Sequence, residues 1–160
     1  MLSDIEFYRK KLHFLVVGYC LMPDHLHLIV WWDVDKDPKL TISKIMQSIK
    51  SHSGKSIANY IHVRGRRGPL TSSMHRSGQG TRPTQKEYPH RRMSEQKYKI
   101  WQPSFYDFNV YSEQKMKQKL DYIHWNPVKA GLCIKPAEWV YSSYKFYSRG
   151  AVGAVHIDSV

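Results

Sequence analysis

The fold is decided by residues 14–32, FLVVGYCLMPDHLHLIVWW. Residues 14–21 are almost entirely apolar, and such a short run predicts a buried strand. The next three residues, Met22-Pro-Asp, are typical of a tight turn, and residues 25–32 predict a second strand. Two strands separated by so short a turn predict a β-hairpin.

Helices are predicted on both sides of this hairpin. Residues 3–12 have apolar side chains at helical spacing, with acidic residues early and basic residues late, as the helix dipole favours. Residues 40–63 repeat the helical spacing and predict one or two helices, with Gly54 as a weak point. Mixed helices and an antiparallel hairpin indicate an α+β fold.

The second half of the chain predicts one further strand and one further helix. The aromatic segment 101–110 is strand-like. Ser112 is a suitable N-cap for the helix that follows, and Pro127 is expected to end that helix near Asn126.

With 160 residues the chain is long enough for one domain with a proper core. We expect that domain to span residues 1–150, followed by a tail at 151–160. Residues 64–99 are rich in Gly, Pro, Ser, Thr and Arg and poor in apolar side chains. They predict a long, flexible, basic insertion within the domain.

The net charge of +12 is concentrated in one central stretch. Residues 39–99 hold 14 Lys and Arg against Glu87 and Glu95, whereas the rest of the chain holds 11 basic and 11 acidic residues. Such asymmetry predicts a polyanionic partner, and nucleic acid rather than a membrane, because no basic amphipathic face accompanies it. A solvated basic surface is the alternative.

Only two cysteines occur, so we expect no structural disulfide and a reducing, cytoplasmic location. The apolar run at residues 14–22 is too short to cross a bilayer, and no signal peptide is evident.

His25 and His27 form the sharpest local pattern. Residues two apart on a strand point to the same face, so both imidazoles are expected to project together. Such a pair supplies half of a divalent metal site and needs an oxygen ligand from elsewhere. By itself the pattern leaves open a chance pair on a surface strand.

Tyr122 and Asn126 lie four residues apart on the predicted helix and therefore share a face. A tyrosine in mid-helix is ordinarily a packing residue, and an Asn before Pro is ordinarily a boundary signal. If this helix met the histidine pair, Asn126 would supply the missing oxygen ligand and Tyr122 would lie beside the metal. A metal polarises a phosphodiester, and a phenol that attacks the phosphorus gives a covalent phosphotyrosine.

Four blocks of the sequence resemble a known family, the REP-associated tyrosine transposases, which are relatives of the single-tyrosine transposases with an HUH motif. They cover about half the chain, in the family's order: GYCLMPDHLHLIV (18–30), WQPSFYD (101–107), LDYIHWNPVKAGL (120–132) and WVYSSY (139–144). The resemblance implies a ferredoxin-like fold, an antiparallel sheet with helices packed on it. It also implies metal-dependent cleavage and rejoining of single-stranded DNA near hairpins, through a 5′-phosphotyrosine. It further implies a bacterial cytoplasmic protein that is associated with the nucleoid.

The resemblance assigns roles to four residues. It implies His25 and His27 as the HUH pair, Tyr122 as the nucleophile and Asn126 as the third ligand of Mg²⁺ or Mn²⁺. One catalytic tyrosine per chain implies a homodimer or successive turnovers when two DNA ends are joined.

The chain departs from the family pattern in two places. Members usually open with a strand before the first helix, so either this strand is missing or the sheet is completed differently. The insertion at residues 64–99 is also longer than expected.

Six basic residues are expected to bind DNA. Five of them are expected to bind phosphates, without reading the sequence: Arg64, Arg66, Arg67, Arg91 and Arg92. The sixth is Lys129, just past the helix that carries Tyr122, and it is expected to contact the strand that is cut. Two alternatives to a transposase remain open. One is a non-catalytic hairpin-binding protein derived from such an enzyme, and the other is a metal-dependent nuclease that uses water while Tyr122 is structural.

Overall fold

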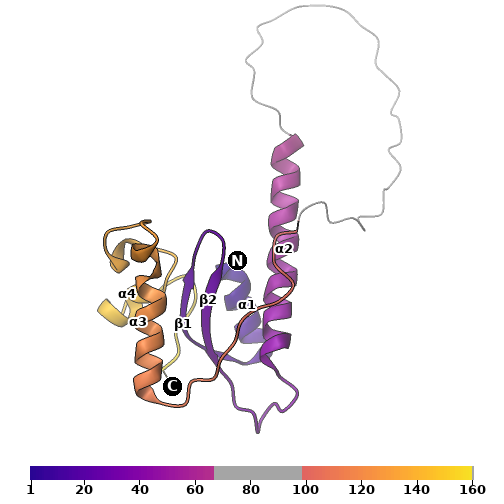
Figure 1. The fold of residues 1–160 in the computed structure, drawn as a ribbon. Helices are drawn as coiled ribbons and strands as arrows, with labels where there is room; N and C mark the ends of the chain where they lie inside the picture. The colour runs from indigo at the N-terminus through magenta and orange to yellow at the C-terminus, as the bar shows by residue number, and fades with distance from the viewer. Residues whose placement is uncertain (67–98, 160) are drawn as a thin grey trace, which may run out of the picture. The chain divides into compact units, whose positions relative to one another are not determined.

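The computed structural model describes residues 1–66 and 99–159. The helices and strands are, in chain order, α1 (Leu2–Leu12), β1 (Leu15–Leu21), β2 (Leu26–Trp31), α2 (Ile42–Arg66), α3 (Glu113–Lys129), the 3-10 helix η1 (Pro136–Glu138) and α4 (Tyr144–Arg149) (Figure 1). The predicted α+β class, with an antiparallel sheet and packed helices, is confirmed. Most of the predicted basic insertion, residues 67–98, lies outside the described residues.

The chain divides into two compact units, which are considered separately. The first comprises Met1–Ser53 and Ser104–Val160, and the second comprises Gly54–Pro103. Helix α2 is continuous across residue 54, so the predicted weak point at Gly54 does not break it. All the residues of the candidate site belong to the first unit.

The predicted hairpin is present as the antiparallel pair β1–β2. Its register runs from Leu15 opposite Trp31 to Leu21 opposite Leu26, with an irregularity between Val16 and Gly18. At the turn, the Met22 amide donates to the His25 carbonyl oxygen at 2.8 Å. Strand β2 thus begins one residue later than predicted, and His25 lies immediately before it.

The two faces of the hairpin carry separate clusters of apolar side chains. Alternation along β2 directs Leu26, Leu28 and Val30 to the first cluster and Ile29 to the second. The first cluster joins the hairpin to α1 and α2 through Ile5, Phe14, Val16, Tyr19, Leu40, Ile45 and Ile49. The second joins it to α3 through Val17, Cys20, Met22 and Ile123, with Met116, Leu120 and Trp139 packed around them.

Gly18 permits the close approach of α3 to the hairpin. A Cβ atom at this position would lie 2.5 Å from Leu120 Cδ2 and 3.4 Å from Ile123 Cδ1. A larger side chain would therefore collide with the face of α3 that packs on β1. This contact sets the distance between the strands and the helix that carries Tyr122.

Two predictions about the second half of the chain are wrong. Helix α3 does not end near Asn126 but continues to Lys129, with Pro127 inside it. Pro127 is fully buried, and tertiary packing overrides the tendency of a proline to end a helix. Termination falls instead at Gly131, whose φ of +69° is the left-handed conformation typical of a helix C-terminus.

The segment 101–110, predicted as a strand, forms neither helix nor strand. The strand was predicted from the aromatic side chains of this segment. Aromatic residues favour strands only where they can pack on the face of a sheet. Here Tyr106 is 89% exposed and Phe108 is 46% exposed, so this packing is missing.

The residues beyond 150, which we expected to form a tail, take part in the core. Val155 and Ile157 belong to the first apolar cluster. The Asp158 amide donates to the Val16 carbonyl at 2.9 Å, which holds the segment along β1. No helix among the described residues is both long enough and apolar enough to span a bilayer.

Candidate functional site

His25 and His27 come together at the start of β2. The Nε2 atoms of the two rings are 3.0 Å apart, and the ring planes are nearly perpendicular, at 89°. The rings can converge although His25 precedes the strand, because the turn directs its side chain back toward that of His27. The two histidines expected to project together are therefore neighbours in space.

Asp24 orients the first of these rings. Its Oδ1 atom lies 2.7 Å from His25 Nδ1, an interaction in which the imidazole N–H donates to the carboxylate. This bond fixes the tautomer that leaves a lone pair on His25 Nε2, the arrangement that commonly supports a metal-binding histidine. Sequence reasoning missed Asp24, although its position next to the histidine was a usable signal.

His27 is held in its neutral form. Burial and, to a smaller extent, the neighbouring His25 together lower its pKa from 6.5 to about 4. A neutral imidazole keeps a lone pair, which is the form that binds metal ions.

Helix α3 brings Tyr122 and Asn126 to the histidine pair. The carboxamide nitrogen of Asn126 lies 2.8 Å from His27 Nε2. The ring of Tyr122 contacts the His27 ring edge to face, with centroids 5.7 Å apart and planes at 81°. Because the two residues are four apart, one helix face presents both groups to the same imidazole.

Tyr122 is open to solvent on its other side. Its side chain is 50% exposed, so a large substrate has access to the phenol. The ammonium group of Lys129, two turns further along α3, lies 5.2 Å from the centre of the ring. The structure thus brings five predicted residues together: His27 contacts His25, Asn126 and Tyr122, and Lys129 lies beside the Tyr122 ring.

The donor atoms at this point have a spacing compatible with a small cation. Two ligands at right angles around a metal, each with a bond of about 2.1 Å, lie about 3.0 Å apart. The His25 and His27 nitrogens have this separation. A half-turn of the Asn126 carboxamide would place its oxygen where its nitrogen now contacts His27. Within the described ranges, no group of three or more His, Cys, Asp or Glu residues is arranged to hold a metal.

The remaining DNA-binding candidates lie in the other unit or outside the described residues. Arg64 and Arg66 lie in the last turns of α2, in the second unit. Arg67, Arg91 and Arg92 lie outside the described residues.

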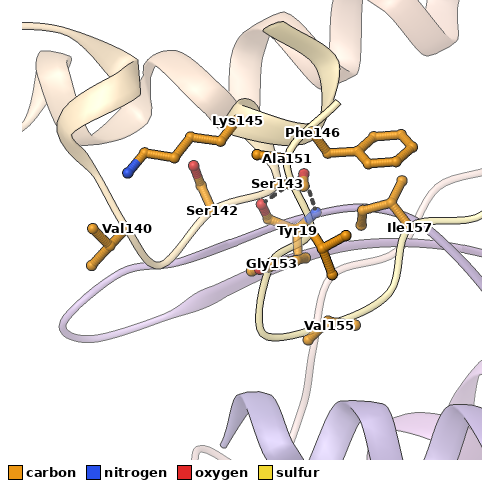
Figure 2. A pocket seen from close by; sticks show the side chains of 11 residues that line it. Tyr19, Val140, Ser142, Ser143, Lys145, Phe146, Ala151, Gly153, Val155 and Ile157 are labelled. Atoms are coloured by element: carbon orange, nitrogen blue, oxygen red, sulfur yellow. Dashed lines mark hydrogen bonds between the residues drawn. The ribbon is translucent and has the colours of Figure 1, made fainter. Parts of the chain in front are cut away.

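A pocket of about 180 Å³ lies elsewhere in the first unit, between Tyr19 of β1, residues 140–146 before and within α4, and the C-terminal segment (Figure 2). None of the candidate site residues lines this pocket. Figure 2 also shows Ser143 bonded to the backbone of Tyr19, so the pocket wall is part of the packing of β1. In the candidate site, His25 and Tyr122 are exposed, whereas His27 and Asn126 are half-buried.

Comparison with known proteins supports the resemblance. The family model described as "Transposase IS200 like" matches residues 2–70. A protein of Haemophilus influenzae named "Putative REP-associated tyrosine transposase" is 27% identical over 134 residues, which are 82% of this chain and 59% of the relative. The chain thus spans less than two thirds of that relative's length.

A solved structure has a similar fold. It is described as a REP-associated tyrosine transposase bound to a REP hairpin, and it matches 100% of this chain and 74% of its own, with a TM-score of 0.57 and 18% sequence identity. The resemblance seen in the four sequence blocks is therefore confirmed: this chain is similar to the IS200-like and REP-associated tyrosine transposases.

Proposed function

We propose that this protein cleaves and rejoins single-stranded DNA near hairpins, with Tyr122 as the nucleophile. The observation that carries the proposal is the position of Tyr122, which packs against His27 on the same helix face as Asn126. A tyrosine with only a packing role has no need of a half-exposed ring beside two convergent imidazoles.

His25, His27 and Asn126 would hold Mg²⁺ or Mn²⁺ in this proposal. When bound, such an ion polarises a phosphodiester and stabilises the negative charge that develops on it. Asp24 acts through His25, whose ring it orients.

The reaction replaces one phosphate ester with another. Tyr122 Oη bonds to the phosphorus, and the bond from phosphorus to the 3′ oxygen breaks. The phenol proton passes to water, and the departing 3′ oxygen takes a proton from water to become a free 3′-OH. The DNA on the other side stays attached as a 5′-phosphotyrosine, and the reverse reaction rejoins the strand. Lys129, close to the phenol, is positioned to pair with the phosphate under attack.

Hairpin DNA is the substrate favoured by the comparisons and by charge. The similar solved structure is described as bound to a REP hairpin, and the charge excess of this chain at residues 39–99 suits a polyanion. Arg64, Arg66, Arg67, Arg91 and Arg92 are proposed to bind phosphates of the stem or its flanks. Joining two ends requires two nucleophiles in succession or a homodimer.

The test is a covalent adduct. The protein is incubated with Mn²⁺ and a DNA hairpin labelled on the 3′ side of the expected cleavage site, and the label is followed on a denaturing protein gel. We expect the wild type to carry label, Tyr122→Phe to carry none, and EDTA to abolish the adduct. Tyr111→Phe is the matched control, because this exposed phenol precedes α3 and should not matter. An undiminished adduct in Tyr122→Phe would refute the nucleophile.

A second candidate function is hairpin binding without cleavage. It is favoured by the similar solved structure, which is described as bound to a REP hairpin. This function predicts salt-sensitive binding of the hairpin and no adduct with any metal. A third outcome, cleavage by Tyr122→Phe but not by His25→Ala, would indicate a nuclease that uses water.

A further inference from the structure

Lys119 lies near both the Phe108 ring and the ring of the proposed nucleophile. The Lys119 ammonium group is 3.9 Å from the centre of the Phe108 ring and 6.0 Å from the centre of the Tyr122 ring. Lys119 precedes Tyr122 by three residues, so the helix places both on one face. This cluster connects the segment before α3 to the candidate site.

The segment at 104–111 exposes aromatic rings that the core does not use. Tyr106 is 89% exposed and Phe108 is 46% exposed, and neither belongs to an apolar cluster. Their ring centroids are 6.1 Å apart, with the planes tilted by 41°. Exposed aromatic rings next to basic groups are what proteins use to stack the bases of single strands.

Two ammonium groups lie near the phenol. Lys119 and Lys129 both lie near the Tyr122 ring. In the part of the chain that the structure describes, neither lysine forms an ion pair with a carboxylate. Two such ammonium groups are available to the phosphates on either side of a nucleotide.

We propose that Phe108 and Lys119 form a subsite for the single-stranded nucleotide next to the phosphate that Tyr122 attacks. Phe108 stacks on the base with its exposed part, and Lys119 pairs with the backbone phosphate. The subsite takes single-stranded DNA of any sequence, because every base has a stacking face and every nucleotide has a phosphate. This inference rests on the proposed function, which supplies the strand, but it concerns binding and not cleavage.

The experiment compares two hairpins in EDTA, so that binding is measured without cleavage. One hairpin is blunt, and the other carries a short single-stranded extension, placed 5′ or 3′ in turn. Phe108→Leu and Lys119→Gln should each weaken binding of an extended hairpin about tenfold, with binding of the blunt hairpin unchanged. Phe108→Trp, which keeps a stacking surface, should bind both hairpins as the wild type does.

Lys117→Gln is the matched control for charge. Lys117 is an exposed lysine on the same helix, and it should affect both hairpins equally and weakly. The subsite is refuted if Lys119→Gln has no larger effect than Lys117→Gln on extended hairpins. Equal losses on blunt and extended hairpins in Phe108→Leu would also refute it, as would a wild-type chain that gains no affinity from the extension.

Failure of this inference is separable from failure of the proposed function. Where the wild type forms an adduct, both variants should raise the DNA concentration for half-maximal rate and leave the rate at saturating DNA unchanged. If the wild type forms no adduct but Phe108→Leu still loses affinity only for extended hairpins, the subsite stands and catalysis does not. If the wild type forms an adduct but the variants bind extended hairpins as the wild type does, the proposed cleavage stands and the subsite is refuted.

Discussion

His124 connects helix α3, which carries Tyr122, to the β1–β2 hairpin. It is 4% exposed, and its Nε2 atom lies 2.8 Å from Ser143 Oγ. Ser143 Oγ in turn accepts from the Tyr19 amide at 3.0 Å and reaches the Tyr19 carbonyl at 3.2 Å. All the hydrogen bonds between α3, Ser143 and β1 can form together when the His124 N–H donates to the Ser143 hydroxyl and that hydroxyl donates to the Tyr19 carbonyl. Such a buried network fixes the position of α3 as well as adding stability.

Stability should therefore fall with pH below neutrality. Burial lowers the pKa of His124 from 6.5 to about 4, although the charge of Asp121 acts against this. Between pH 4 and pH 6.5 the unfolded chain binds more protons at His124 than the folded chain does. The free energy of unfolding therefore rises with pH across this range and falls as the pH is lowered from 6.5 towards 4. We expect this residue to contribute about 2–3 kcal/mol to the loss, measured by urea unfolding in EDTA.

His124→Gln is the informative variant for this prediction. It keeps an N–H donor for Ser143 but does not titrate, so the slope of stability against pH should flatten relative to the wild type. Some slope should remain, because the pKa of His27 is also lowered to about 4 by burial. An unchanged slope in His124→Gln would mean that His124 does not set the acid limit.

Individual site residues were predictable where spacing within one element decides their direction. His25 and His27 are two apart, and Tyr122 and Asn126 are four apart, so each pair could be expected to act together. That the two pairs meet depended on the resemblance to a family. Asp24 and Lys119 were missed, because their contacts depend on a turn and on the path of residues 104–111.

At the scale of elements, the outer edge of β1 is covered by C-terminal segments. The Leu21 amide donates to the Tyr141 carbonyl at 2.9 Å, and the Ser143 amide donates to the Tyr19 carbonyl at the same distance. Further along, the Asp158 carboxylate accepts from the Val16 amide at 2.9 Å. The unpaired backbone groups of a strand edge are thus partly satisfied without another strand.

Among the residues that cover the edge of β1, substitution of Asp158 should lower the free energy of unfolding most. Its carboxylate also accepts from Arg9 Nε at 3.1 Å and from Arg9 Nη2 at 2.7 Å, and both side chains are 14% exposed. Asp158→Ala removes the acceptor of the Val16 amide and leaves the partly buried Arg9 guanidinium with only Glu6, at 3.6 Å, so we expect a loss of about 2–3 kcal/mol in unfolding free energy.

Chemical denaturation of two companion variants checks this explanation. Asp158→Asn keeps an acceptor and should lose less than Asp158→Ala. Asp35→Ala removes an exposed carboxylate from the loop before α2 and should change stability by less than about 0.5 kcal/mol. If all three variants were equally stable, the segment beyond residue 150 would be no more than the tail that its sequence predicts.

The elements were predictable where a hydrophobic period is strong. Helix α1, the hairpin and α2 follow their patterns to within a few residues. The segment 101–110 failed because aromatic content resembles a strand whether or not a sheet face is available. The role of Val155 and Ile157 was hidden because two apolar residues in a short, Gly-containing stretch form no period.

For the whole molecule, the distribution of charge predicts how the proposed binding of DNA should respond to salt. The excess of basic residues lies at residues 39–99, and a contact with each stem phosphate releases counterions, which steepens the dependence of affinity on salt. If Arg66 and Arg67 each bind a phosphate, changing both to Gln should reduce the slope of log affinity against log salt by about 1.8.

The control for this experiment removes two positive charges from the part of the chain outside residues 39–99, where basic and acidic residues are equal in number. Lys10 and Lys36 are exposed and already pair with Glu6 and Asp33, so changing both to Gln should leave the slope nearly unchanged. The slopes are obtained by titrating a labelled hairpin at several salt concentrations with each protein. Equal slopes for the arginine and lysine double variants would place the DNA contact elsewhere. A reduced slope confined to the arginine variant would instead assign non-specific affinity to the central basic stretch, separate from the turn and α3, where the reaction is proposed to take place.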